Sequence, residues 1–501
     1  MTKQYKPATL GQLKASGYVS RSVKDEIRQN LIARMQKKEP LFPGIVGYGD
    51  TVVPQLINAV LSRHDFILLG LRGQAKTRIL RALPEFLDEW TPVIPGSPVN
   101  ECPLSPTTVE GRRRVSEEGD DLEIGWLHRE ARYQEKLATP DVTIADLIGD
   151  IDPIKAASKK LDYSDERVIH YGIIPRTNRG IFAINELPDL QPRIQVGLLN
   201  ILEERDFQIR GFPVRIPLDI QMVFSANPED YTNRGNIITP LRDRIQSQIL
   251  THYPRSVEEG MAITGQEAWL DRPEVDVRVP AFLKEIIEEV AIQARESEYV
   301  DQNSGVSARM TIALAENVAS NAERRALLLG EKSAVARICD LTHSTSAVSG
   351  KVELVLEGEQ EGPLNVARHL IGRGVKAFFA RKFPSAFPPK KRRNEPADES
   401  LAGSEYREIL EWFAAGKSVE VGDDNTDAEF LAGLDAVKGL RKVATKHLKP
   451  ESDGELAVAM ELVLEGLHQH SILTREHVDG RAITYRDMFK SMFSSLGKDE
   501  S

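Results

Sequence analysis

Three short apolar runs, each bounded by turn residues, lie in the first half of the chain. They are "DFILLG" at 65–70, "GIFAINEL" at 180–187 and "IQMVFSAN" at 220–227. A run that stays apolar on both faces is typical of a strand buried in a parallel sheet. Helical patterns separate the runs, notably "PRIQVGLLNILEER" at 192–205. Strands that alternate with helices predict a parallel sheet with right-handed crossovers.

Helical periodicity dominates after about residue 255. Two amphipathic patterns, "PAFLKEIIEEVAIQARES" at 280–297 and "SARMTIALAENVASNAERRALLLG" at 307–330, predict long helices. The stretch "GKVELVLEGEQEG" at 350–362 is interpreted as one strand and a turn, a hairpin extension of this helical region. The prolines and the basic run Lys390–Arg393 in the next segment indicate a solvated linker.

These patterns divide the chain into five expected parts. They are an N-terminal helical segment at 1–40, an α/β core at 41–255, a helical region at 256–382, the linker at 383–400 and a C-terminal helical module at 401–501.

Composition and charge narrow the class of protein. The 501 residues carry a formal net charge of -10, which argues against wrapping by nucleic acid because such binding needs a basic surface. The sequence contains no run of about 18 apolar residues, so no membrane span is expected. Only two cysteines, Cys102 and Cys339, are present, and the first residues lack the apolar core of a signal peptide. We therefore expect a reducing, cytoplasmic location without a disulfide framework.

The segment "GLRGQAKT" at 70–77 has the character of a phosphate-binding loop. Glycines at 70 and 73 allow the backbone N–H groups to approach an anion closely, and the following helix adds its positive end. Lys76 would supply a point charge to the phosphates of ATP, and the hydroxyl of Thr77 would ligate Mg²⁺. Ala75 replaces the usual last glycine, which costs little if that residue has right-handed helical torsions. The expected nucleotide contacts in this loop are Gly70, Arg72, Gly73, Gln74, Ala75, Lys76, Thr77 and Arg78.

A second motif, "IFAINE", supplies the carboxylate that ATP hydrolysis needs. Glu186 stands where a base that orients the attacking water is expected, at the end of a strand that should neighbour the strand before the loop. Asn185 occupies the position of the usual metal-binding aspartate. Its amide oxygen can contact the Mg²⁺ shell without adding negative charge, so we expect weaker metal binding. Asp189 is close enough in sequence to compensate.

With both motifs in order, residues 41–310 resemble the AAA+ ATPases of the helix-2-insert group, which include the I subunit of magnesium and cobalt chelatases and the MoxR ATPases. "FPGIVGYGDTVVPQLINAV" at 42–60 is similar to the segment that closes over the adenine in these proteins. The loop is similar to the MoxR phosphate loop, which also tends to place alanine before the lysine. "ATPDVTIADLIGDIDPIKAA" at 138–157 and "LLNILEERDFQIRG" at 198–211 are similar to the insert and to the helix and hairpin that follow.

The resemblance implies further site residues. "VFSANPED" would carry the sensor asparagine, Asn227. "ITPLRDRI" would carry the arginine finger that reaches the ATP of a neighbouring subunit, with Arg244 as the candidate and Arg242 as the fallback. "GVSARMTIALAENVA" would begin the lid helix with a second sensor arginine, Arg309.

The resemblance also implies a fold and an activity. We expect a P-loop AAA+ parallel-sheet core with a helical lid, assembled into a ring, by analogy a hexamer. The ring would hydrolyse ATP with Mg²⁺ to remodel a partner, such as chelatase subunits or a protein with an integrin-like domain. That domain's Asp-x-Ser-x-Ser motif is absent from this chain.

Two alternatives stay open. Asn185 favours an ATP-binding scaffold with little turnover. A DNA-acting AAA+ regulator is the second, although the loop Gly-Ala-Phe-Thr-Gly-Ala of that class is missing and the net charge is acidic.

Overall fold

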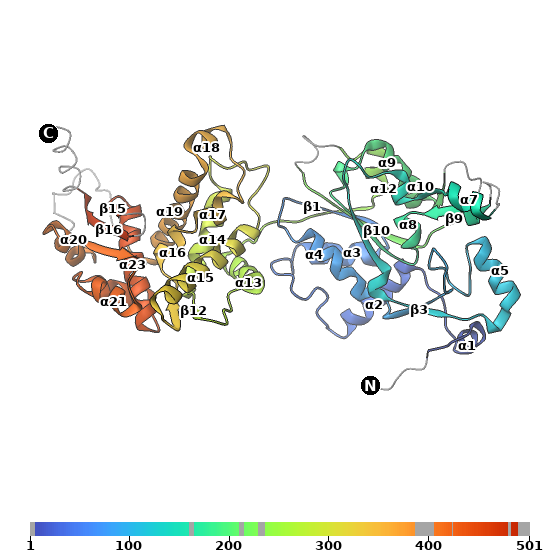
Figure 1. Ribbon diagram of the computed structural model, residues 1–501, viewed down its shortest axis with the longest axis horizontal. Helices are drawn as coiled ribbons and strands as arrows, with labels where there is room; N and C mark the ends of the chain where they lie inside the picture. The colour runs from blue at the N-terminus through green and yellow to red at the C-terminus, as the bar shows by residue number, and fades with distance from the viewer. Residues whose placement is uncertain are drawn as a thin grey trace. The chain divides into compact units, whose positions relative to one another are not determined.

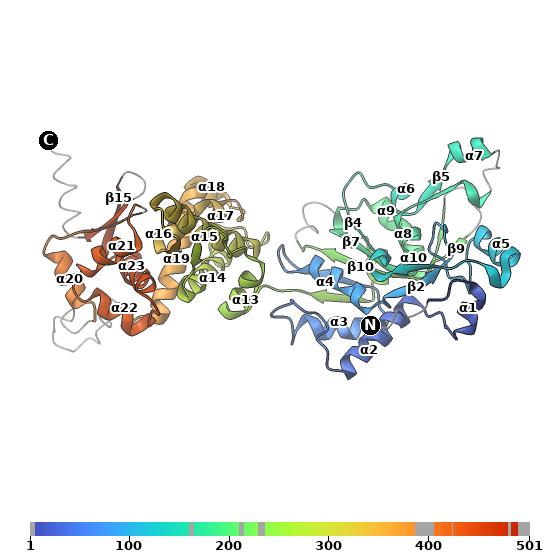
Figure 2. The same cartoon turned by 60° about the horizontal axis from the view of Figure 1, so that its bottom comes forward.

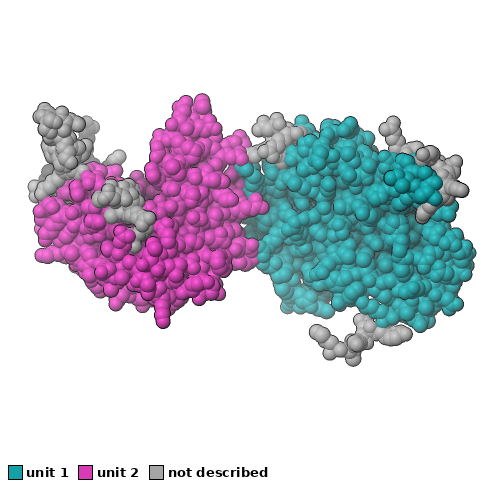
Figure 3. Space-filling view, viewed as in Figure 1, with its two compact units in different colours: residues 1–252 teal, residues 253–501 magenta. Residues whose placement is uncertain are grey.

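The computed structural model describes residues 6–159, 165–209, 215–228, 236–385, 405–422, 424–478 and 482–488. The chain forms two compact units, residues 1–252 and 253–501, which Figure 3 colours separately. The predicted linker falls almost entirely outside the described residues, as does the basic run Lys390–Arg393. None of the described helices is both long and apolar enough to cross a bilayer.

A five-stranded parallel sheet forms the centre of unit 1, as the apolar runs predict. The strand order is β11-β1-β10-β7-β4, and every neighbouring pair is parallel. The strands are β1 (Phe66–Leu69), β4 (Tyr133–Leu137), β7 (Gly180–Asn185), β10 (Ile220–Ala226) and β11 (Ser247–Leu250). All residues of β1, β7 and β10 are buried, which is why their sequences are apolar at successive positions.

Helices cover both faces of this sheet (Figures 1 and 2). Phe66 and Leu68 pack into one cluster with helices α2 (Val23–Gln36), α3 (Val52–Leu61) and α4 (Lys76–Ala82). Ile67 and Leu69 point to the opposite face, into a cluster with α9 (Pro192–Gly197), α10 (Leu199–Glu203) and α12 (Thr239–Arg244). Alternate residues of one strand thus serve two cores, which confirms a three-layer α/β unit.

Short elements surround this core. Among the described residues of unit 1, the remaining α-helices are α1 (Leu10–Ala15), α5 (Val109–Glu118), α6 (Ile144–Leu147), α7 (Pro153–Lys159) and α8 (Ile173–Arg176). Three two-stranded antiparallel sheets pair β2 (Trp90–Val93) with β3 (Gly125–His128), β5 (Gly149–Ile151) with β6 (Ile169–Tyr171), and β8 (Asp206–Gln208) with β9 (Arg215–Pro217).

One expectation about the sheet is wrong. The strand before the phosphate loop, β1, and the strand that ends in the acidic motif, β7, are not neighbours, because β10 lies between them and pairs with both. Sequence patterns identify buried strands but carry no signal for their order. All three strands are parallel, so their carboxyl ends still meet at one edge of the sheet.

Unit 2 is largely helical. Its helices are α13 (Val257–Glu267), α14 (Ala281–Arg295), α15 (Arg309–Leu329), α16 (Ile338–Thr342), α17 (Thr345–Ser349), α18 (Leu356–Glu361), α19 (Pro363–Lys382), α20 (Arg407–Ala414), α21 (Asp427–Asp435), α22 (Leu440–Leu448) and α23 (Asp453–Gln469). One continuous hydrophobic cluster runs from Val275 to Tyr485, so residues predicted as lid and as C-terminal module share a core.

Strands also occur in unit 2, beyond the helical pattern that the sequence predicts. β12 (Asp276–Arg278) pairs with β13 (Ser333–Val335), and β14 (Val419–Gly422), β16 (Ala482–Asp487) and β15 (Leu473–Val478) form a three-stranded antiparallel sheet. The hairpin expected at 350–362 is wrong. Leu354 makes one isolated bridge with Val300, and the acidic residues that follow form α18, where carboxylates favour the first turn of a helix.

Candidate nucleotide-binding site

The predicted phosphate loop connects β1 to α4, and close backbone contacts hold it. A side-chain carbon at Gly70 would lie 1.9 Å from Thr251 Oγ1 and 2.1 Å from Gln74 Oε1, so only glycine fits there. Thr251, which follows β11, donates its hydroxyl to Gln74 Oε1 at 2.7 Å. The Tyr48 hydroxyl donates to the Gln74 carbonyl oxygen at 2.9 Å. Two segments distant in sequence therefore anchor the loop.

Two loop residues have left-handed torsions. Gly73 has φ 75°, which glycine adopts freely. Ala75 has φ 54° and ψ 16°, so the right-handed torsions under which alanine would cost little are not present. A left-handed conformation costs an alanine about 1–2 kcal/mol, because its Cβ crowds the following carbonyl oxygen. Ala75 turns the chain sharply into α4, which begins at Lys76.

Lys76 is 7% exposed, and its ammonium contacts the loop and a neighbouring strand end. Nζ donates to the Gly70 carbonyl oxygen, to the Leu71 carbonyl oxygen at 3.0 Å and to Asn227 Oδ1 at 2.5 Å. Asn227 in turn donates Nδ2 to Glu186 Oε2 at 2.8 Å. The asparagine after β10 thus bridges the lysine after β1 and the glutamate after β7, the three residues that the sequence places at strand ends.

Glu186 is also left-handed, with φ 56° and ψ 50°. The residue ends β7 and precedes a 3-10 turn, Leu187–Asp189, in which the Asp189 N–H donates to the Glu186 carbonyl oxygen at 3.0 Å. Non-glycine residues in this region cost about 1–3 kcal/mol and cluster at functional sites. The left-handed turn at Glu186 and the one at Ala75 lie at the same edge of the sheet.

Asn185 is buried, and its amide contacts a serine on β10. Ser225 donates its hydroxyl to Asn185 Oδ1 at 3.1 Å, while Ser225 Oγ accepts the Glu186 N–H at 3.4 Å. Thr77 is half-buried, and Arg72 and Arg78 are exposed. Among the residues that the structure describes, no three His, Cys, Asp or Glu side chains form a metal-binding group. The neutral oxygens of Thr77 and Asn185 fit Mg²⁺, which proteins hold through few ligands together with substrate phosphates.

The two arginines of α12 differ in their surroundings. Arg244 donates Nε to Glu203 Oε2 at 2.7 Å and Nη1 to the Pro240 carbonyl oxygen at 3.0 Å. Arg242 is exposed, and its side chain has no hydrogen bond or ion pair with any residue in the described ranges. Arg309 is the first residue of α15 in unit 2, so its role toward nucleotide stays a prediction.

The family comparison agrees with this geometry. Residues 65–245 match the model of the AAA domain, dynein-related subfamily. Residues 65–245 thus form an AAA domain. The match spans β1 to α12 and thus includes the phosphate loop, the acidic motif and both arginines of α12. The AAA+ assignment made from the ordered motifs is confirmed, and so is the P-loop fold.

No curated protein matches the chain in sequence. The solved structures that the chain matches include NtrX from Brucella abortus, at 13% identity and TM-score 0.31, with 58% of this chain and 55% of that chain covered. A complex of the magnesium chelatase subunits BchI and BchD gives 22% identity and TM-score 0.34, with coverage of 64% and 98%. Hsp104 with casein gives 14% identity and TM-score 0.37, with coverage of 66% and 52%. The chain thus spans about half of NtrX and of Hsp104.

Sequence reasoning missed the residues that hold the AAA site in place. Thr251 lies after the edge strand β11 and matches no motif, yet it fills the space beside Gly70. Ser225 is one of seven buried residues of β10, and its contact with Asn185 depends on the neighbouring strand. Tyr48 lies within a recognised segment, but its bond to Gln74 depends on tertiary packing.

Proposed function

We propose that this AAA+ protein hydrolyses ATP. The observation that carries the proposal is the hydrogen-bonded chain from Lys76 through Asn227 to Glu186, which gathers a cation, an amide and a carboxylate at one edge of the sheet. A cation can hold the phosphates, an amide can orient a water or a phosphate oxygen, and a carboxylate can act as a base.

The residues divide the work as follows. The backbone N–H groups around Gly73 and the Lys76 ammonium bind phosphate oxygens. When ATP binds, the ammonium gives up its hydrogen bonds to the Gly70 and Leu71 carbonyl oxygens and donates to the phosphate oxygens instead. Glu186 orients the attacking water and accepts its proton, while Asn227 holds the carboxylate in position. The oxygens of Thr77 and Asn185 would hold Mg²⁺, which would supply positive charge to offset the charge that develops on the phosphates.

We further propose that hydrolysis is completed by an arginine from a neighbouring copy in a ring. Arg244 is held by Glu203, whereas the exposed Arg242 lies two residues away on the same short helix. Both are therefore candidates for the finger. A finger variant should bind ATP with unchanged affinity yet lose hydrolysis, and mixing it with the Lys76→Ala variant should restore part of the activity.

The proposed work of the ring is to remodel a partner protein or complex. The resemblance to the chelatase I subunit and the MoxR group supports this, with chelatase subunits or an integrin-like-domain protein as the partner class. Arg309 would couple the lid to the state of the nucleotide. Both cysteines are free and buried, which is consistent with work in a reducing compartment such as the cytoplasm.

The test compares steady-state ATP hydrolysis in four proteins: wild type, Lys76→Ala, Glu186→Gln and the matched control Glu130→Gln. Glu130 is exposed on the same unit and lies outside the site. Loss of a general base lowers turnover by about 100-fold or more, so Glu186→Gln should be nearly inactive while Glu130→Gln matches wild type. Equal turnover in all four would refute the catalytic roles.

An ATP-binding scaffold with little turnover is the second candidate, and Asn185 is the observation that favours it. Its amide is buried against Ser225 and adds no charge to the metal site. The Asn185→Asp variant separates the two functions, because an aspartate supplies the missing charge. A large gain in ATP hydrolysis would identify the natural protein as an ATP-binding scaffold with little turnover. No gain would favour a protein that already hydrolyses ATP efficiently.

A further inference from the structure

A surface pocket of about 520 Å³ lies in unit 1, away from the phosphate loop. Its lining includes Ile220, the first residue of β10, and Lys24 of the pocket is paired with Asp65, which immediately precedes β1. Because β1 and β10 are parallel, the pocket lies at the amino-terminal edge of the sheet, opposite the edge that carries Lys76. Its volume is in the range of small-molecule sites.

Basic side chains dominate this pocket, which we call the amino-edge pocket. Four of them line it: Arg21, Lys24, Arg63 and Arg205. They come from three separate parts of the chain, so their convergence is a property of the fold. Asp219 is the one carboxylate in the lining.

Carboxylates pair with all four of these cations, and two of the cations share one carboxylate. Asp65 is fully buried, with Oδ1 2.8 Å from Lys24 Nζ and Oδ2 2.9 Å from Arg205 Nη2. Burial lowers the pKa of Lys24, and the nearby Arg205 charge acts in the same direction against the attraction of Asp65. Arg21 pairs with Asp88 and Arg63 pairs with Asp25, neither of which lines the pocket.

One nitrogen in this arrangement lacks a hydrogen-bond partner. Arg205 Nη1 is buried and has no acceptor among the described residues, whereas Lys24 Nζ lies 2.8 Å from Asp65 Oδ1. A buried donor without an acceptor costs about 1–3 kcal/mol. The Arg205 side chain lines the pocket, so a small rotation at its end would offer this donor to a ligand.

The remaining polar groups favour an anion with several oxygens. Ser20 and Ser105 line the amino-edge pocket and carry hydroxyl donors, whereas the hydroxyl of Ser22, also in the lining, donates to Asp25 Oδ2 at 2.7 Å. The carboxylate of Asp219 is turned toward the first turn of α2, where the Val23 N–H donates to Oδ1 at 3.0 Å and to Oδ2 at 2.9 Å. The positive end of the α2 dipole therefore offsets much of the negative charge of Asp219.

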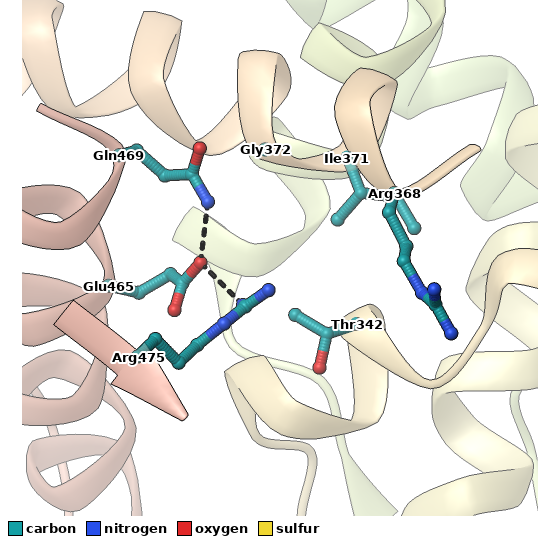
Figure 4. A pocket seen from close by; sticks show the side chains of 7 residues that line it. All are labelled: Thr342, Arg368, Ile371, Gly372, Glu465, Gln469 and Arg475. Atoms are coloured by element: carbon teal, nitrogen blue, oxygen red, sulfur yellow. Dashed lines mark hydrogen bonds and ion pairs between the residues drawn. The ribbon is translucent and has the colours of Figure 1, made fainter. Parts of the chain in front are cut away.

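A cavity in unit 2 provides a contrast (Figure 4). Arg475 lies beside it, but the cavity measures only about 20 Å³. Arg475, one of its two arginines, is already matched, because Glu465 Oε1 accepts from Arg475 Nη1 at 2.8 Å and from Gln469 Nε2 at 2.8 Å. This space suits a single water. Its size distinguishes the amino-edge pocket from this cavity.

We propose that the amino-edge pocket binds the phosphoryl group of a small molecule, at a site separate from the ATP site. Guanidinium groups present planar pairs of donors that match phosphate oxygens, and the ammonium and hydroxyl donors complete the set. The pocket exceeds the size of a bare phosphate ion, which leaves room for an organic moiety beside Leu218 and Ile220. The proposal does not depend on the proposed ATP hydrolysis.

The test is isothermal titration of the full chain with inorganic phosphate and, separately, with ribose 5-phosphate. All proteins carry Lys76→Ala, so that the phosphate loop does not compete. The key variant is Arg63→Gln, because Arg63 is 55% exposed and, among the described residues, forms its ion pair with Asp25. The matched control is Arg167→Gln, since Arg167 is 56% exposed, pairs with Asp165 and lies outside the pocket. Thermal unfolding verifies that each variant is folded.

We expect one binding site, weakened at least tenfold by Arg63→Gln and further by adding Arg205→Gln, with Arg167→Gln unchanged. Ribose 5-phosphate bound at least tenfold more tightly than phosphate would assign an organic phosphate as the ligand. Equal affinities would assign free phosphate. Absence of binding by both probes, or equal affinity in Arg63→Gln and Arg167→Gln, would overturn the proposal.

Discussion

The close approach at Gly70 leads to a sharp prediction about the phosphate loop. We consider the substitution Gly70→Ala, which adds a single methyl group. That carbon would lie 1.9 Å from Thr251 Oγ1 and 2.1 Å from Gln74 Oε1, the two atoms that share the 2.7 Å hydrogen bond anchoring the loop. Neither atom can stay in place, so the loop must shift or the bond must break.

The magnitude follows from two contributions. Overpacking by one methyl group in a tight site costs about 1–3 kcal/mol. Loss of the Thr251–Gln74 hydrogen bond adds about 0.5–1.5 kcal/mol. Together they give about 2–4 kcal/mol. If half of this falls on nucleotide binding through misplaced N–H groups, affinity should drop by about 5–30-fold, since 1.4 kcal/mol corresponds to a factor of ten.

The assay is titration with a fluorescent ATP analogue, paired with thermal unfolding. The matched control is Gly433→Ala in α21, because a side-chain carbon at Gly433 meets no atom within 4 Å and its φ is not in the left-handed region. The double variant Gly70→Ala with Thr251→Ala removes the nearest obstacle and should recover part of the affinity. Wild-type affinity in Gly70→Ala, or an equal loss in Gly433→Ala, would refute the steric reasoning.

Two further predictions concern strain and buried charge. Ala75→Gly relieves a left-handed cost of about 1–2 kcal/mol against a backbone-entropy cost of about 0.5–1 kcal/mol; the melting temperature should rise slightly, and a clear fall would contradict the torsion. Glu461 is fully buried and accepts the N–H groups of Ile338 and Cys339 at 2.7 and 3.0 Å, and burial raises its pKa from 4.5 to about 8. The folded state therefore favours the protonated acid. The contribution of Glu461 to the free energy of unfolding is fully present below pH 4.5, and up to about 5 kcal/mol of it is lost as the pH rises to about 8. Glu461→Gln should flatten this decline in denaturant unfolding between pH 5 and pH 8, whereas parallel pH profiles would exclude Glu461 as its cause.

The sequence alone determined which segments form the core of the AAA domain. "DFILLG", "GIFAINEL" and "IQMVFSAN" become β1, β7 and β10, because a strand covered on both faces needs apolar residues at successive positions. The motif residues Lys76, Glu186 and Asn227 could be located for the same reason, since each follows directly after, or a short loop beyond, a recognisable strand.

Only the tertiary structure decided how these pieces meet. The place of β10 between β1 and β7 depends on pairing between segments about 40 to 150 residues apart, which no local pattern encodes. The left-handed torsions of Ala75 and Glu186 persist because packing around each turn outweighs their intrinsic cost. The amino-edge pocket likewise arises where distant segments converge. Its basic residues look like ordinary surface residues in the sequence, and the carboxylate that Lys24 and Arg205 share, Asp65, becomes apparent only once the chain is folded.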